Sequence, residues 1–112
     1  MLKDALHGKV VHEPVLRSIA ATARRYAIPE VHLFEIIEGV RCDLTQSRYE
    51  TTNSLIQYCR LVASAVGLSA VPIWGVRPGV PSEEWMPHAD ACGLAFQWTN
   101  ILRDIVEDRE RD

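Results

Sequence analysis

The apolar residues of this chain recur mainly at the three- and four-residue spacing that is typical of amphipathic helices. Pro14 can occupy the first turn of a helix, and Pro29 favours a helix end just before it. The Pro/Gly-rich segment 74–81 is a predicted linker, and Ser82 is a good N-cap for a helix after it. No segment alternates with a period of two for long enough to predict a strand. The pattern therefore predicts an all-α fold with about four helices, over residues 14–26, 31–43, 52–73 and 82 to the chain end.

The last predicted helix combines two patterns. Apolar side chains cover most of its circumference between residues 93 and 108, as in helices that are buried. Four polar residues nevertheless follow one narrow stripe at positions i, i+3, i+7 and i+11: Gln97, Asn100, Asp104 and Asp108. Because buried polar groups need partners, we expect this stripe to face polar groups, a ligand or a water-filled cavity.

The two carboxylates of the stripe are candidates for metal binding. Asp104 and Asp108 are i, i+4 neighbours, and like charges at this spacing destabilise a helix. A divalent cation would remove the repulsion, and oxygen ligands on one face suit Mg²⁺ that shares its shell with substrate phosphates. The alternative is a solvated helix end, in which Arg109 and Arg111 act as local counter-charges.

The third predicted helix carries an apolar stripe that would pack against the fourth. Its members are Tyr58, Val62, Ala65 and Val66. Gly67 and Ala70 add small side chains beside this stripe. Small residues either let another helix approach closely or leave room for a long apolar ligand, and the residues themselves favour neither.

Composition narrows the class of protein. The 112 residues are 47% hydrophobic and 24% charged, as in an ordinary soluble domain. A net charge of −3 without a Lys/Arg cluster argues against a nucleic-acid partner. The three widely spaced cysteines, Cys42, Cys59 and Cys92, are expected to be reduced core residues of a cytoplasmic protein. The uncharged run 61–76 is shorter than a membrane span and is expected to be a buried helix.

Three sequence motifs resemble the squalene/phytoene synthase family, the head-to-head prenyl-diphosphate synthases. The string Gln-x-Thr-Asn-Ile-Leu-Arg-Asp-x-x-x-Asp over 97–108 resembles the second aspartate-rich motif of that family. Segment 58–67 resembles its Y-C-x-x-V-A-G-x-V-G signature, and segment 43–49 resembles D-L-x-x-x-R-Y. The matches extend from about Pro14 to Asp108, and they imply part of the helical bundle of the isoprenoid (terpenoid) synthase fold.

The resemblance implies a Mg²⁺-dependent prenyltransferase that joins two prenyl diphosphates, of farnesyl type to squalene or hydroxysqualene or of geranylgeranyl type to phytoene. It implies that the catalytic residues are Tyr58, Asp104 and Asp108, and that the metal ligands are Asn100, Asp104 and Asp108. The implied substrate-binding residues are Tyr58, Val62, Val66, Gly93, Phe96, Gln97, Asn100 and Arg103. Arg103 could instead pair within the protein.

The chain also departs from the family pattern. Ser64 stands where the family usually has glycine and Trp98 where a smaller residue is common, and both are expected to narrow the prenyl channel. Residues 1–103 contain no D-x-x-x-D, whereas the family has a first aspartate-rich motif on an earlier helix. We therefore expect residues 1–112 to be the central portion of such an enzyme. The apolar product suggests peripheral membrane contact, and uncovered helices suggest self-association.

A second interpretation is a catalytically incomplete helical remnant. Such a chain would bind metal or prenyl diphosphate weakly, or would only associate with itself. Both interpretations remain open from the sequence.

Overall fold

The computed structural model describes residues 1–111, and at Asp108 it describes the backbone alone. The all-α prediction is confirmed, since no strand occurs within residues 1–111. The elements are α1 (Leu2–Leu6), α2 (Pro14–Arg25), α3 (Glu30–Thr45), α4 (Thr52–Cys59), the π-helical segment η1 (Arg60–Ser64), α5 (Ala65–Trp74) and α6 (Ser82–Arg111).

The predicted helices correspond to α2, α3, the continuous rod α4–η1–α5, and α6. Pro14 lies in the first turn of α2, as the sequence predicts. The third predicted helix is capped by Thr51 through a reciprocal pair of hydrogen bonds with Ser54. Gly75 ends α5 with a φ of 91°, a left-handed value that glycine adopts without strain. The short helix α1 was not predicted, because five residues are too few to show periodicity.

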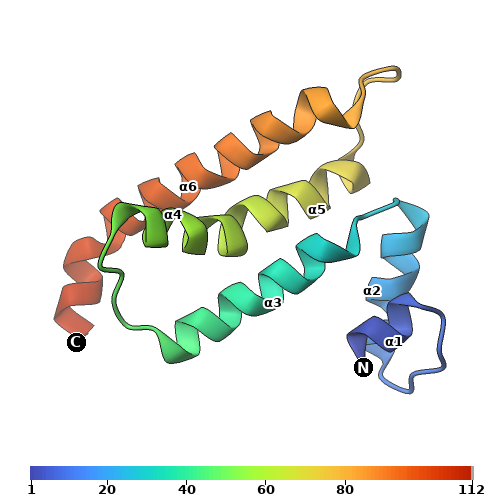
Figure 1. Ribbon diagram of the computed structural model, residues 1–112, viewed down its shortest axis with the longest axis horizontal. Helices are drawn as coiled ribbons and strands as arrows, with labels where there is room; N and C mark the ends of the chain where they lie inside the picture. The colour runs from blue at the N-terminus through green and yellow to red at the C-terminus, as the bar shows by residue number, and fades with distance from the viewer. Residues whose placement is uncertain (112) are drawn as a thin grey trace.

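The rod α4–η1–α5 lies in the middle of the molecule, with α6 along one side and α3 along the other (Figure 1). The helix α2 lies beside the N-terminal end of α3, and α1 packs against α2. The molecule measures 44 × 37 × 21 Å. Its shortest dimension is only about two helix diameters. The central rod is therefore the only long helix in the described residues that has a long helix packed on both sides.

Two glycines let the neighbouring helices approach the π-helical segment. A Cβ atom at Gly93 of α6 would lie 2.7 Å from the backbone N and Cα of Ser64. A Cβ atom at Gly39 of α3 would lie 2.7 Å from Cγ1 of Val62. Both distances are shorter than real carbon contacts, so these positions require glycine for packing. The hydroxyl of Ser64, which is fully buried, donates to the carbonyl of Asp90 at 3.0 Å and ties η1 to α6.

The expectation that the fourth helix is buried all round is wrong for this chain. Phe96, Leu102 and Val106 of α6 are each more than 60% exposed, at 67%, 61% and 67%. Among the described elements only the central rod covers α6 at length. One face of α6 is thus packed, and its other apolar residues contact solvent.

The central rod also differs from the expectation for run 61–76. The stretch Thr52–Trp74 is long and apolar enough to cross a membrane by length and composition, although core helices of soluble proteins also meet this criterion. In this chain the stretch lies between α3 and α6, and most of its residues are only partly buried.

Candidate active site

A cleft runs between the central rod and the middle of α6. Its volume is about 350 Å³, and small-ligand pockets usually have volumes of roughly 300–1,000 Å³. Apolar or small side chains make up most of both walls. Six of the residues that the sequence analysis selected for substrate binding line it: Val62, Val66, Gly93, Phe96, Gln97 and Asn100. The structure therefore brings the first half of the polar stripe together with Val62 and Val66 of the rod in one cleft.

Asp104 lies one helical turn beyond Asn100, past the end of this cleft. The guanidinium of Arg103 donates to both of its carboxylate oxygens, from Nε to Oδ1 at 2.6 Å and from Nη2 to Oδ2 at 2.8 Å. These hydrogen bonds hold the pKa of the Asp104 carboxyl below its ordinary value. Arg103 does not line the cleft, so in this structure it pairs with Asp104. The side chain of Asp108 lies outside the described residues, and its predicted catalytic and metal-binding roles remain predictions.

The donor atoms near the end of the cleft fit a magnesium ion only in part. The side chains of Asn100 and Asp104 offer the oxygen ligands that Mg²⁺ prefers. Within the side chains that the structure describes, no group of three or more His, Cys, Asp or Glu residues could hold a metal. Both oxygens of Asp104 are also occupied by Arg103. The residues therefore fit an ion that shares its shell with substrate phosphates, and they do not form a complete metal site.

Tyr58 is the predicted site residue that the structure places elsewhere. Its hydroxyl donates to Oδ1 of Asp43 at 2.6 Å, and its ring packs on that of Tyr49 with 4.9 Å between centroids. Burial, and next the hydrogen bond to Asp43, raise the pKa of Tyr58 well above its ordinary value. Tyr58 lines a separate cavity of about 370 Å³ at the junction of α3 and α4. This corrects the prediction that Tyr58 faces the polar stripe of α6.

The hydrogen bond to Asp43 accounts for this correction. The predicted stripe assumes 3.6 residues per turn throughout, and at that pitch Tyr58 and Val66 already differ by about 80° around the helix. The π-helical segment η1 lies between them and changes their relation by about one further residue. In the structure the hydroxyl of Tyr58 turns toward α3, whereas Val62 and Val66 line the cleft against α6.

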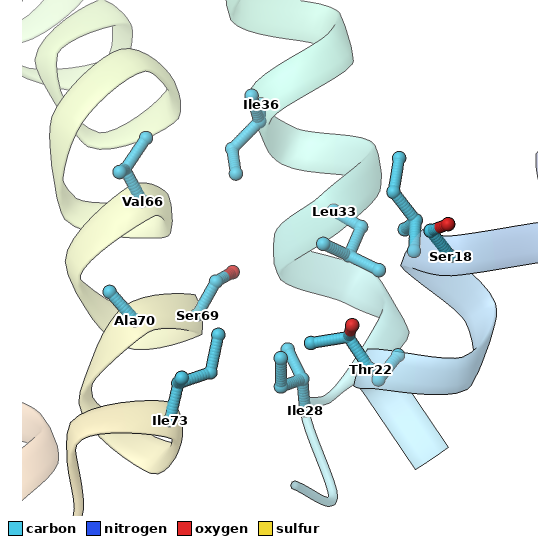
Figure 2. A pocket seen from close by; sticks show the side chains of 11 residues that line it. Ser18, Thr22, Ile28, Leu33, Ile36, Val66, Ser69, Ala70 and Ile73 are labelled. Carbon is cyan, nitrogen blue, oxygen red and sulfur yellow. The ribbon is translucent and has the colours of Figure 1, made fainter. Parts of the chain in front are cut away.

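A second apolar cavity lies on the other side of α5, and the sequence analysis missed it. Its volume is about 360 Å³, and residues of α2, α3 and α5 line it. Figure 2 shows Ser69 and Ile73 of α5 pointing toward Ile28 and the first half of α3. Val66 lines this cavity as well as the cleft against α6. Leu33 and Ile36 of α3 line it and recur at helical spacing, but such spacing alone does not show which element faces them.

Small side chains differ in their roles around these cavities. At Gly67 an added Cβ would make an ordinary contact, 3.6 Å from the carbonyl oxygen of Ala89. Ala70 instead lines the open space between α2, α3 and α5. The structure thus contains both alternatives that the sequence left open, close packing between helices and room for an apolar ligand.

Three other sequence expectations need correction. Neither Ser64 nor Trp98 lines the cleft between the rod and α6, so neither narrows it. Ser64 is instead packed against Gly93. Of the cysteines, Cys59 is buried and Cys42 is partly buried, whereas Cys92 is exposed and lines the cleft. All three are free thiols in the structure.

Comparison with known proteins gives one family. A sequence profile described as Squalene/phytoene synthase matches residues 2–112. Phytoene synthase 1, chloroplastic, of Arabidopsis thaliana is 42% identical over an alignment of 112 positions, which covers 98% of this chain and 26% of that protein. The 15-cis-phytoene synthase of Enterobacter agglomerans is 38% identical over 100 residues, which are 89% of this chain and 32% of that protein.

The chain therefore spans about a quarter to a third of the length of these relatives. No solved structure matches it. The profile match covers nearly the whole chain and includes the residues of the cleft, so the chain belongs to the squalene/phytoene synthase family.

Proposed function

We propose that this chain is the central part of a prenyltransferase that condenses two prenyl diphosphates head to head with the help of Mg²⁺. We propose geranylgeranyl diphosphate as the substrate, with phytoene as the product, because the relatives in the comparison are phytoene synthases. Farnesyl diphosphate, with squalene or hydroxysqualene as the product, is the competing choice. The two substrates differ only in chain length, so a binding measurement can compare them directly.

The observation that carries this proposal is the pair of apolar cavities on the two sides of α5. A head-to-head condensation needs two long apolar chains held close together. Val66 lines both cavities, so a chain in either cavity would contact the same residue. The cleft against α6 ends at the polar residues Gln97 and Asn100, and Asp104 follows one turn later. This arrangement suits a ligand with an apolar tail and an anionic head.

Different residues of the chain would bind the tails, orient the diphosphate and hold its counter-ion. Apolar walls bind the tails and exclude water, which would otherwise quench a carbocation. Asn100 and Asp104 orient the diphosphate end and hold its counter-ion. When bound, Mg²⁺ supplies the positive charge that stabilises the departing diphosphate. Arg103 can exchange Asp104 for a phosphate oxygen, because its side chain is exposed.

Residues 1–112 supply only one of the two carboxylate clusters that we expect the reaction to need. Diphosphate ionisation in this family is expected to need two facing carboxylate clusters, and the sequence supplies only the pair Asp104 and Asp108. We therefore propose that the 112-residue chain binds prenyl diphosphate with Mg²⁺ and that catalysis requires further carboxylates from outside these residues. The alternative is that the isolated chain is a catalytically incomplete remnant, which binds metal or prenyl diphosphate weakly or only associates with itself.

Calorimetric titration of the chain with geranylgeranyl diphosphate, with and without Mg²⁺, tests the proposal. Mg²⁺ alone should bind weakly, because one carboxylate pair leaves most of its shell to water. Mg²⁺ with the diphosphate should bind at least tenfold more tightly than either alone, because phosphate oxygens complete the shell. Asp104→Asn combined with Asp108→Asn should abolish this coupling.

Glu107→Gln is the matched control, because it removes a carboxylate of the same helix that lies beside the stripe. It should leave the coupling nearly unchanged. If diphosphate binding does not depend on Mg²⁺, or is unchanged in the double variant, the proposed metal site is wrong. The two aspartates would then only belong to a solvated helix end. A preference for farnesyl diphosphate would keep the reaction class and correct the substrate.

A further inference from the structure

A further cavity lies in the N-terminal part of the molecule, away from the cleft against α6. Its volume is about 450 Å³, and all of its lining residues come from α1, α2 and the loop between them. Three alanines line it, Ala5 of α1 and Ala20 and Ala21 of α2. Four basic side chains line it as well: Lys9 and His12 of the loop, and Arg17 and Arg24 of α2. The cavity therefore differs from the two apolar cavities in both place and chemistry.

The spacing of residues along α2 explains how the space arises. Arg17 and Arg24 are seven residues apart, so they lie on one face of the helix, separated by about 10 Å along its axis. Ala20 and Ala21 follow Arg17 by three and four residues and therefore lie between the two arginines on the same face. Because alanine has only a methyl group, α2 leaves open space between two long cationic side chains.

The two arginines have no acidic partner. Among the described residues, neither Arg17 nor Arg24 forms an ion pair, whereas Lys9 is paired with Asp4 at 2.7 Å. Arg24 donates one hydrogen bond, from Nη1 to the carbonyl of Ala5 at 3.2 Å, which fixes its guanidinium beside the cavity. A guanidinium carries several further N–H donors, and these remain available to a ligand.

The charge of this part of the chain is opposite to that of the whole. Residues 1–29 contain five Lys or Arg residues and two carboxylates, a net charge of +3, although the whole chain carries −3. The sequence analysis found no Lys/Arg cluster because the four basic lining residues are spread over positions 9–24. Only the packing of α1 and its loop on α2 brings them to one cavity.

We propose that this cavity binds the phosphate group of an anionic ligand without the help of a metal ion. Guanidinium groups form forked hydrogen bonds to phosphate oxygens, and the side chains of Lys9 and His12 add N–H donors of the same kind. The site shares no residue with the cleft, so this proposal does not depend on the proposed function. The alternative is that the basic residues only keep the surface of α2 hydrated.

A free diphosphate and the phosphate headgroup of a lipid share this chemistry. Val10 lines the cavity and is 89% exposed, so it would contact acyl chains if the phosphate belonged to a lipid. With a free diphosphate, Val10 would stay in water. The two sources therefore need separate probes.

Inorganic pyrophosphate in the presence of EDTA is the first probe. EDTA removes the Mg²⁺ that the carboxylates of α6 would need to hold a diphosphate, so the probe reports on the basic cavity. An NMR titration of the 112-residue chain should show saturable shifts of the backbone amides of Val10, Val11 and His12. Sodium chloride at the same ionic strength should not produce these shifts.

Arg17→Gln is the main variant, because the Arg17 side chain forms no hydrogen bond or ion pair with the described residues and its loss should leave the fold intact. It should weaken pyrophosphate binding about fivefold, as expected for one exposed charged contact. Arg17→Gln combined with Arg24→Gln should remove saturable binding. Circular dichroism checks the helices, and Arg17→Glu replaces the double variant if that variant loses helicity.

Arg25→Gln is the matched control. It removes the same charge from the same helix, but Arg25 does not line the cavity and instead lies over the ring of Tyr26, 5.4 Å from its centroid. It should change the affinity for pyrophosphate less than twofold. Equal weakening in Arg17→Gln and Arg25→Gln would show an effect of net charge alone and would overturn the proposal.

Vesicles of phosphatidylcholine, with and without phosphatidic acid, are the second probe. If the chain sediments only with vesicles that contain phosphatidic acid, and Arg17→Gln but not Arg25→Gln reduces this, the phosphate belongs to a lipid. Binding of pyrophosphate without binding to these vesicles identifies a free phosphate compound. Both results support the site. If neither probe binds, the cavity holds no phosphate group and the proposal is wrong, while the proposed function is unaffected.

Discussion

At the scale of single residues, spacing located the polar stripe but not its partners. Gln97 and Asn100 line the cleft, as a stripe on an apolar helix predicts. Spacing alone does not predict the pairing of Asp104 with Arg103, because adjacent residues on a helix point in different directions. The bond between Tyr58 and Asp43 was not predicted, because it joins residues of different helices.

The pairing of Arg103 with Asp104 leads to a prediction about metal affinity. Arg103→Ala should raise the pKa of Asp104 toward its ordinary value, because it removes the hydrogen bonds that now lower this pKa. The same change should strengthen binding of Mg²⁺ in the absence of substrate only modestly, by about threefold, since solvent screens an exposed ion pair. Carboxyl resonances followed by NMR against pH and against Mg²⁺ would measure both effects.

Arg77→Ala is the control for this prediction. Arg77 carries the same charge but lies in the loop between α5 and α6, before the start of α6. It should change neither the pKa of Asp104 nor the affinity for Mg²⁺. An Arg103→Ala variant that behaves like this control would show that the ion pair does not compete with the metal.

At the scale of elements, the sequence predicted the long helices because each repeats its apolar spacing over three or more turns. It could not predict η1, because a single π turn changes the count by about one residue and leaves composition unaltered. That turn lies between Tyr58 and Val66 and changes how the two side chains are oriented relative to each other. The close approach of α3 and α6 to η1 was also invisible, since a helical glycine shows nothing of what lies opposite it.

These glycines allow a matched test of helix packing. Gly93→Ala should reduce the free energy of unfolding by about 1–3 kcal/mol, because the new methyl group would overlap backbone atoms of Ser64 that cannot move freely. Gly67→Ala places the same group 3.6 Å from its nearest neighbour and should be neutral or stabilising by up to about 1 kcal/mol, since alanine favours the helix. Urea unfolding of the two variants gives the comparison. Equal stabilities would mean that α6 does not pack closely on η1.

At the scale of the whole molecule, the chain is extended and incompletely covered. Its radius of gyration is 16.1 Å, whereas a compact domain of this length would have about 13 Å. Its accessible surface is 8187 Å², against roughly 6,200 Å² expected from its mass. Among the described residues, the buried hydrophobic side chains are those of four alanines, Ile28 and Cys59. The larger apolar residues remain partly or largely exposed, as expected of helices that normally have further neighbours.

This exposed surface predicts self-association of the 112-residue chain. Leu102 and Val106 are i, i+4 neighbours on α6 and are 61% and 67% exposed, so they form a continuous apolar strip. Strips of this kind bind other apolar surfaces in water. Analytical ultracentrifugation at tens of micromolar should therefore show dimers or larger species, and a hydrophobic dye should bind. Leu102→Lys combined with Val106→Lys should shift the chain toward monomer and weaken dye binding.

Leu44→Lys is the control, because Leu44 is 82% exposed at the end of α3, on a different helix from this strip. It should leave association nearly unchanged if α6 provides the contact, because the strip would remain intact. An equal loss of association in both variants would indicate non-specific aggregation rather than a contact along α6. A monomer at every concentration, without dye binding, would show that the exposed residues of α6 are covered in solution by a rearrangement of the chain itself.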